Sequence, residues 1–296
     1  MPEVLIHGRR LAYQEAGGDG ATVLLVHGIT NSSRTWTPVT ERLAESGLHV
    51  LAPDLPGHGD SQRQRGDHSL GAHASILRDF LHVVDHEHVT VVGHSLGGGV
   101  VMQFSYQFPE AVERMVLVSS GGLGREVSLA IRAATLPFAE QVIGVGASRP
   151  VTRTAGLLGR ALGRAGVKLG GDFAEIMEGL SSLSDIERRE AFVRTARSVI
   201  TPRGQRVAAT DKLYLVADLP TLLVAGERDS VIPADHTRGA AHLVPGSRLE
   251  IFDESGHFPH LDEPDRFADL VASFVRDTQP ARFDRARARR RIIQGA

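Results

Sequence analysis

The pentapeptide Gly93-His94-Ser95-Leu96-Gly97 constrains the fold of this chain more than any other segment. It directly follows the apolar residues 89–92. A serine hydroxyl is a weak nucleophile at neutral pH, so it needs a neighbouring base and a position that stands clear of the backbone. A tight turn from a strand into a helix gives that position, and small flanking residues allow the two elements to approach closely. The segment therefore predicts such a turn with Ser95 as a candidate nucleophile. The alternative is a glycine-lined helix start without a catalytic role.

Apolar runs of strand length alternate with helical stretches along most of the chain. A hairpin is expected at residues 4–6 and 10–14, and buried strands are expected at 22–27, 49–52, 88–93, 115–118, 220–225 and 249–252. Continuous apolar runs suit strands that are buried on both faces of a sheet. Strands that alternate with helices indicate a mostly parallel sheet covered on both faces. We therefore predict an α/β fold with a mostly parallel eight-stranded sheet.

The alternation stops between residues 121 and 213, where helical stretches dominate and no convincing buried strand occurs. This segment predicts an inserted helical cap, and it divides the core domain into residues 1–120 and 214–280. Ligands of parallel sheets bind at the carboxyl ends of the strands. A cap inserted after a strand that ends near residue 118 would therefore lie over Ser95.

Composition excludes several kinds of chemistry and location. The 296 residues include no cysteine, which excludes disulfides, a thiolate nucleophile and a cysteine-bound metal. The first residues lack the basic and apolar regions of a secretion signal, and no run of 18 apolar residues occurs. We expect a cytoplasmic protein without a membrane span.

The formal net charge of −2 is unevenly distributed, because residues 282–291 carry six arginines and one aspartate. Residues 281–296 are therefore interpreted as a basic, disordered C-terminal tail. Contact of this tail with an anionic lipid or nucleic-acid surface is the alternative. Nothing else in the chain indicates nucleic-acid binding, so no nucleic-acid partner is expected.

A serine nucleophile needs a base, and the base needs an acid that orients it. Asp229 follows the predicted strand at 220–225, and His257 follows the strand at 249–252. Residues just past different parallel strands converge at one edge of the sheet, and the chain order serine, aspartate, histidine is the order expected for this arrangement. Ser95, Asp229 and His257 are therefore the predicted triad. Glu227 and His260 are the rival acid and base.

Backbone N–H groups must also stabilise the oxyanion of the reaction intermediate. The residue after the nucleophile, Leu96, supplies one donor at the start of its helix. The loop after the strand at 22–27 supplies the other, for which Ile29 is predicted. Gly28 allows the turn of that loop, and His27 braces it.

These motifs together resemble the α/β-hydrolase superfamily of serine hydrolases with a helical cap. The matching segments are His27-Gly28, residues 52–61, residues 93–98, residues 226–229 and Gly256-His257. The resemblance implies the α/β-hydrolase fold, a Ser-His-Asp mechanism and a small-molecule substrate, with no cofactor and no metal. It leaves the substrate open, because the superfamily includes esterases, lipases, lactonases, C–C hydrolases, epoxide hydrolases and dehalogenases.

The residues at four places in this chain narrow the choice of reaction within the superfamily. Ser95 stands where epoxide hydrolases and haloalkane dehalogenases carry a carboxylate nucleophile. Hydrolases of aromatic meta-cleavage products usually carry Gly-Pro-Gly-Ala after the His-Gly pair, asparagine before the nucleophile and tryptophan after the base. This chain has residues 29–32 (Ile-Thr-Asn-Ser), His94 and Phe258 at those positions.

The sequence thus supports a serine hydrolase that cleaves a carboxylic ester or lactone of a small to medium apolar substrate through an acyl-enzyme. Four residues are expected to bind this substrate, namely His94, Phe258, Phe138 and Met177. The first alternative is a C–C bond hydrolase of the meta-cleavage-product type, which needs a cationic anchor such as Arg132 or Arg194. The second is a ligand receptor on the same fold without turnover. A homodimer is a further hypothesis.

Overall fold

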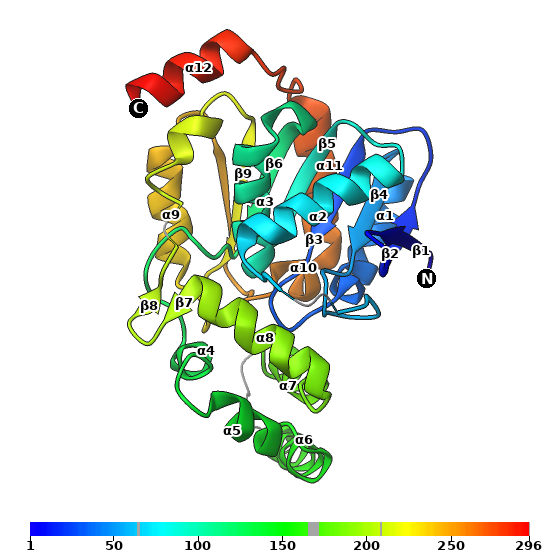
Figure 1. Cartoon of the computed structure of the whole chain (residues 1–296), viewed down its shortest axis with the longest axis vertical. Coiled ribbons are helices and arrows are strands. Elements are labelled where there is room, and N and C mark those ends of the chain that lie inside the picture. Colours follow the sequence, from blue (N-terminus) through cyan, green and yellow to red (C-terminus); the bar gives the residue numbers. More distant parts are fainter. Residues whose placement is uncertain (64–65, 165–171, 208, 296) are drawn as a thin grey trace.

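The computed structural model describes residues 1–63, 66–164, 172–207 and 209–295 (Figure 1). Within these ranges one sheet has eight strands, in the order β1-β2-β4-β3-β5-β6-β9-β10. Only the pairs β1–β2 and β2–β4 are antiparallel, so the predicted mostly parallel eight-stranded sheet is confirmed. The strands are β1 (Glu3–Ile6), β2 (Arg9–Ala16), β3 (Thr22–Val26), β4 (His49–Pro53), β5 (Val89–His94), β6 (Val112–Val118), β9 (Thr221–Gly226) and β10 (Arg248–Phe252).

Helices cover both faces of this sheet, because the central strands bury side chains on each side. From β3, Leu24 and Val26 pack into one core, and Val23 and Leu25 pack into the other. The first core is covered by α2 (Leu70–Val83), α3 (Leu96–Gln107) and α9 (Ala234–Leu243). The second is covered by α1 (Thr37–Glu45) and α11 (Pro264–Asp277). Every residue of β3 is buried, as expected for a two-sided strand.

Residues 121–213, which we call the helical insertion, connect β6 to β9. Figure 1 shows its helices α4 to α8 together below the sheet in this view. Its elements are α4 (Leu129–Ala133), α5 (Ala139–Gly146), α6 (Arg149–Arg164), α7 (Phe173–Ser182), α8 (Ile186–Val199), β7 (Ile200–Thr201) and β8 (Gly204–Gln205), and η3 (Leu213–Val216) then leads from the insertion to β9. The first two helices of the insertion, α4 and α5, are separated around Pro137 and the left-handed Phe138. A proline inside a helical pattern ends the helix before it.

The C-terminal segment contains a helix, α12 (Arg285–Gln294), where we expected a disordered tail. Asp284 caps it, since its Oδ1 accepts hydrogen bonds from the N–H groups of Ala286 and Arg287 at 2.8 and 3.1 Å. Asp218 then pairs with Arg287 and Arg291 at 2.9 and 2.5 Å. The helix therefore rests on the core through two of its arginines.

In the part of the chain that the structure describes, no helix is both long enough and apolar enough to cross a membrane.

Candidate active site

Ser95 lies at the junction of β5 and α3 with a strained backbone, at φ 54° and ψ −116°. A non-glycine residue in such a conformation persists only where its surroundings hold it. Here the N–H of Ser95 donates to the carbonyl of Val118 at 3.0 Å, and the N–H of Gly121 donates to the carbonyl of Ser95 at 2.9 Å. The end of β6 and the start of the helical insertion thus hold the serine in place.

Two glycines allow α3 to pack closely against β5 and against the end of β3. A Cβ atom on Gly93 would lie 2.3 Å from the carbonyl oxygen of Gly97, and one on Gly97 would lie 2.2 Å from the carbonyl oxygen of Val26. Any side chain at either position would therefore force the strands and the helix apart. Gly93 and Gly97 have the steric role that the pentapeptide predicts.

The predicted acid and base meet in the structure. Nδ1 of His257 lies 2.8 Å from Oδ2 of Asp229, and both side chains are almost fully buried. Oδ1 of Asp229 accepts hydrogen bonds from the N–H groups of Val231 and Ile232, at 2.7 and 2.8 Å. The carboxylate is thus held from both sides, and it orients the imidazole. Such a pair favours the tautomer with its proton on Nδ1, which leaves Nε2 of His257 free for the role of the predicted base.

The rival residues are engaged elsewhere. Glu227 forms an ion pair with Arg238 on the surface. His260 lies on the short helix α10 (Pro259–Asp262), and its Nε2 is 3.0 Å from the hydroxyl of Thr35. The acid–base contact is therefore made by Asp229 and His257 and not by Glu227 and His260.

His94 is buried against the loop of His257. Its Nε2 is 2.8 Å from the carbonyl oxygen of His257, to which it donates, and the two rings are 4.8 Å apart. Burial, together with the nearby His260 and His257, holds the pKa of His94 well below its ordinary value. The neutral ring therefore links the residue before Ser95 to the loop of the base.

The loop after β3 passes directly over the nucleophile. A Cβ atom on Gly28 would lie 3.3 Å from Cβ of Ser95, and the side chain of Ile29 lines the same pocket as Ser95. Among the described residues, the backbone N–H groups of Ile29 and Leu96 donate to no acceptor. Two free amides beside the nucleophile are what an oxyanion hole requires.

Two neutral histidines brace this loop from below. His27 accepts a hydrogen bond from the N–H of Leu55 at 3.0 Å through Nε2, and it donates to the carbonyl of Gly28 at 2.8 Å through Nδ1. His58 donates from Nε2 to the carbonyl of Ile29 at 2.7 Å. Burial lowers the pKa of both residues to about 4. Both rings are therefore uncharged near neutral pH.

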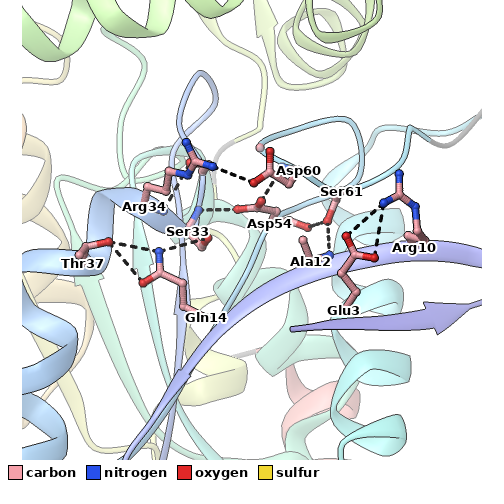
Figure 2. A network of polar contacts seen from close by, with 12 residues as sticks. Glu3, Arg10, Ala12, Gln14, Ser33, Arg34, Thr37, Asp54, Asp60 and Ser61 are labelled. Carbon is pink, nitrogen blue, oxygen red and sulfur yellow. Dashed lines mark hydrogen bonds and ion pairs between the residues drawn. The ribbon is translucent and has the colours of Figure 1, made fainter. Parts of the chain in front are cut away.

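A buried carboxylate fixes the far end of the loop (Figure 2). Oδ1 of Asp54 accepts the N–H of Ser33 at 2.6 Å, where the turn η1 (Ser33–Trp36) begins. Oδ2 of the same group accepts the N–H of Asp60 at 2.7 Å. Asp54 belongs to the matched segment 52–61, yet the sequence did not indicate this role. It joins the loop after β3 to the loop after β4.

A pocket opens beside Ser95 between α3 and the helical insertion, and we call it the α3 slot. One face of α3 forms its floor through Leu96, Gly99, Met102, Gln103 and Tyr106. These residues recur every three or four positions, which places them on one side of a helix. At a rise of 1.5 Å per residue, the floor from Leu96 to Tyr106 extends about 15 Å.

The remaining walls of the slot are mostly aliphatic. They include residues of the insertion and residues that follow Asp229, namely Val127, Ile131, Val199, Ile200, Val207, Ala209, Val231 and Ile232. The spacing of three or four residues along α3 is a sequence signal from which the floor could have been found. No local pattern identifies the residues of the insertion that complete the walls.

The four residues expected to bind substrate do not line the described α3 slot. Phe138 is 75% exposed on the insertion, and Met177 is half-buried on α7. Phe258 is buried, with its ring 5.0 Å from that of His94 and 5.1 Å from that of His257. His94 and Phe258 thus pack beside the ring of His257. Neither Phe138 nor Met177 belongs to the described lining of the pocket beside Ser95.

In the residues that the structure describes, no group of three or more histidine, aspartate or glutamate side chains is arranged to hold a metal ion.

The buried histidines predict that stability falls with acid. His27 and His58 have pKa values of about 4 and His260 of about 3, because burial disfavours their charged forms. The unfolded chain binds protons near pH 6.5 and the folded chain does not, so the free energy of unfolding decreases as pH falls from 6.5 towards 4. Each group should contribute a loss on the order of 2 to 3 kcal/mol by pH 4.5.

Urea unfolding at several pH values between 7 and 4.5 measures this decrease. The variant His58→Asn keeps a donor for the carbonyl of Ile29 but does not titrate, so its stability should depend less steeply on pH. Equal stability at pH 7 and pH 4.5 would contradict the prediction.

Comparison with known proteins adds to this geometry. An uncharacterized protein of Mycobacterium tuberculosis (strain H37Rv) is 42% identical over 292 residues, which cover 98% of this chain and 85% of that protein. A meta-cleavage product hydrolase from Pseudomonas fluorescens has a similar structure, with a TM-score of 0.72 and 21% identity over 94% of this chain and 98% of that one. A thermophilic esterase from Thermogutta terrifontis also gives a TM-score of 0.72, with 22% identity over 94% and 99% of the two chains.

The two solved structures are less than 25% identical to this chain, so their similarity shows the fold alone. The model of the alpha/beta hydrolase family matches residues 23–270, a range that includes the Ser95 turn, the helical insertion and the loops of Asp229 and His257. The chain therefore belongs to the alpha/beta hydrolase family.

Proposed function

We propose that this hydrolase is a serine esterase that cleaves carboxylic esters, including lactones, with an apolar acyl group. Ser95 is the nucleophile, His257 the general base and acid, and Asp229 the group that orients His257. The support is the strained serine turn, the hydrogen bond of 2.8 Å between His257 and Asp229, and the apolar slot beside Ser95.

The proposed reaction has two halves. The hydroxyl of Ser95 attacks the acyl carbon as Nε2 of His257 takes its proton, and the N–H groups of Ile29 and Leu96 bind the oxyanion. The C–O bond then breaks, the alcohol leaves with the proton from His257, and an acyl-enzyme remains. Water attacks this ester with His257 again as the base, which releases the acid and restores Ser95.

The α3 slot is the observation that carries the choice of an ester with an apolar acyl group. Its floor and walls are mostly aliphatic, and Lys212 is the one charged residue among its described lining. Lys212 is exposed, so its ammonium remains in solvent. Burial of an acyl chain in this slot contributes about 0.8 kcal/mol for each methylene group.

The C–C hydrolase alternative requires a cation for the carboxylate of its substrate. Neither proposed anchor lines the described slot. Nε of Arg132 donates to the carbonyl of Pro202 at 2.8 Å, and Arg194 is exposed on α8. The receptor alternative is separated from an enzyme by turnover, since a receptor binds its ligand in stoichiometric amount and releases little product.

Hydrolysis of p-nitrophenyl esters of increasing acyl length tests the proposed function. Replacement Ser95→Ala should lower kcat by about a thousandfold or more, because it removes the nucleophile of a triad that acts as a unit. Ser105→Ala on the same helix loses a buried hydroxyl bonded to the carbonyl of Val101 and should keep its activity.

A fluorophosphonate probe should label Ser95 in the wild type, as intact-protein and peptide mass spectrometry can show. Wild-type turnover no greater than that of Ser95→Ala would refute the esterase proposal.

The slot also predicts how acyl length is limited. Tyr106 ends the floor of the slot, and it also borders the groove under α12 that Leu219 and Ile292 help to line. Replacement Tyr106→Ala should join the two spaces and shift the optimum of kcat/KM to longer acyl chains. Each additional buried methylene should raise kcat/KM about fourfold in the variant.

Tyr214→Ala is the matched control, because Tyr214 lies on η3 outside the described linings of both spaces. Profiles of kcat/KM against acyl length for the two variants and the wild type give the comparison. An unchanged optimum in Tyr106→Ala would show that the acyl chain does not extend along α3.

A further inference from the structure

A carboxylate from the helical insertion contacts the loops of both the acid and the base. Asp172 is only 5% exposed, although it precedes helix α7 of the insertion. Its Oδ1 accepts the backbone N–H of His257 at 2.6 Å, and its Oδ2 accepts the hydroxyl of Ser230 at 3.1 Å. Ser230 is the residue after Asp229. One buried side chain thus joins the insertion to both polar loops of the triad.

The loop of His257 is held by three carboxylates in succession. The hydroxyl of Ser255 donates to Glu263 at 2.8 Å, and the N–H of Gly256 donates to Asp262 at 2.8 Å. These two acceptors follow the same loop in the core. Only the third acceptor, Asp172, belongs to the insertion. Of these three hydrogen bonds, the one at His257 itself therefore depends on the insertion.

Close packing shows that Asp172 is fitted to this position. A Cβ atom on Gly256 would lie 2.3 Å from Oδ1 of Asp172, so the absence of a side chain at residue 256 admits the carboxylate. The backbone N–H of His257 is buried, and without Asp172 it has no other acceptor among the described residues. A buried donor without a partner destabilises the conformation that buries it.

We infer that Asp172 is a positioning residue that makes the orientation of His257 depend on the seating of the helical insertion. The inference rests on the proposed function, in which His257 is the base. Asp172 does not touch the reacting atoms. It holds the backbone from which the imidazole projects, and through Ser230 it holds the loop of the acid that orients that imidazole. When the insertion lies against the sheet, Asp172 fixes the backbone of His257 and thereby the orientation of its imidazole.

Three variants separate this role from general stability. Asp172→Ala removes the acceptor, and Asp172→Asn keeps an amide oxygen that accepts the same N–H. Asp185→Ala is the matched control, because Asp185 also lies in the insertion and accepts one backbone N–H, that of Arg188 at 2.9 Å, far along the chain from the triad loops.

Steady-state hydrolysis of a p-nitrophenyl ester is the first measurement, with each variant assayed below its own melting temperature. Asp172→Ala should lower kcat on the order of tenfold to a hundredfold with a smaller change in KM, since a buried donor loses its partner. Asp172→Asn should recover most of kcat, and Asp185→Ala should retain it. If Asp172→Ala does not fold, Asp172→Glu replaces it, because the longer side chain displaces the acceptor and should also lower kcat.

The second measurement is the NMR signal of the Nδ1 proton that His257 shares with Asp229, in protein with labelled histidine. Asp172→Ala (or Asp172→Glu) should shift or broaden this signal, whereas Asp185→Ala should leave it unchanged. A kcat within twofold of wild type, an unchanged signal, or an equal loss of kcat in Asp185→Ala would overturn the inference. Failure of the proposed function is distinct, because then the wild type itself would show neither turnover nor labelling of Ser95.

Discussion

The close contact between β5 and α3 is the constraint on which the candidate site depends. Gly93 lets β5 approach α3, Gly97 lets α3 approach the end of β3, and Ser95 takes its strained conformation between the two glycines. The same contact sets the position of Leu96, whose N–H is the proposed donor to the oxyanion, and the direction of α3. Because the slot floor is a face of α3, the geometry of the proposed nucleophile and the proposed place of the acyl chain follow from one packing contact.

The hydrogen-bond partners of the buried histidines, and not burial itself, separate His257 from the histidines that support the loops. His27, His58 and His94 are buried and bound to backbone carbonyls, so burial holds their pKa values low and keeps them neutral. A neutral ring can donate from one nitrogen and accept at the other, as His27 does between Leu55 and Gly28. His257 differs because its partner is a carboxylate. In the proposed reaction, Asp229 is the group that would stabilise an imidazolium on His257.

Local patterns account for the parts that the sequence predicted. The strands of the sheet, the Ser95 turn and the loops that bring Asp229 and His257 together each depend on neighbours in the chain, so periodicity and spacing were sufficient. Phe138 and Met177 could not be placed in this way, since a helix of the insertion can turn an apolar residue to solvent or to a pocket. Helix α12 shows the same limit. Its N-cap, Asp284, is local in sequence, but the pairing of Arg287 and Arg291 with Asp218 is tertiary.

Two of the connections between the helical insertion and the site have different physical origins. Its aliphatic residues form walls of the α3 slot, so an acyl chain bound there as proposed would hold the insertion against α3 through burial of apolar surface. Asp172 is a polar connection from the same insertion to the backbone of His257. An acyl chain in the slot and a correctly set base therefore favour the same position of the insertion. Binding energy from a part of the substrate that does not react can in this way support the orientation of the catalytic base.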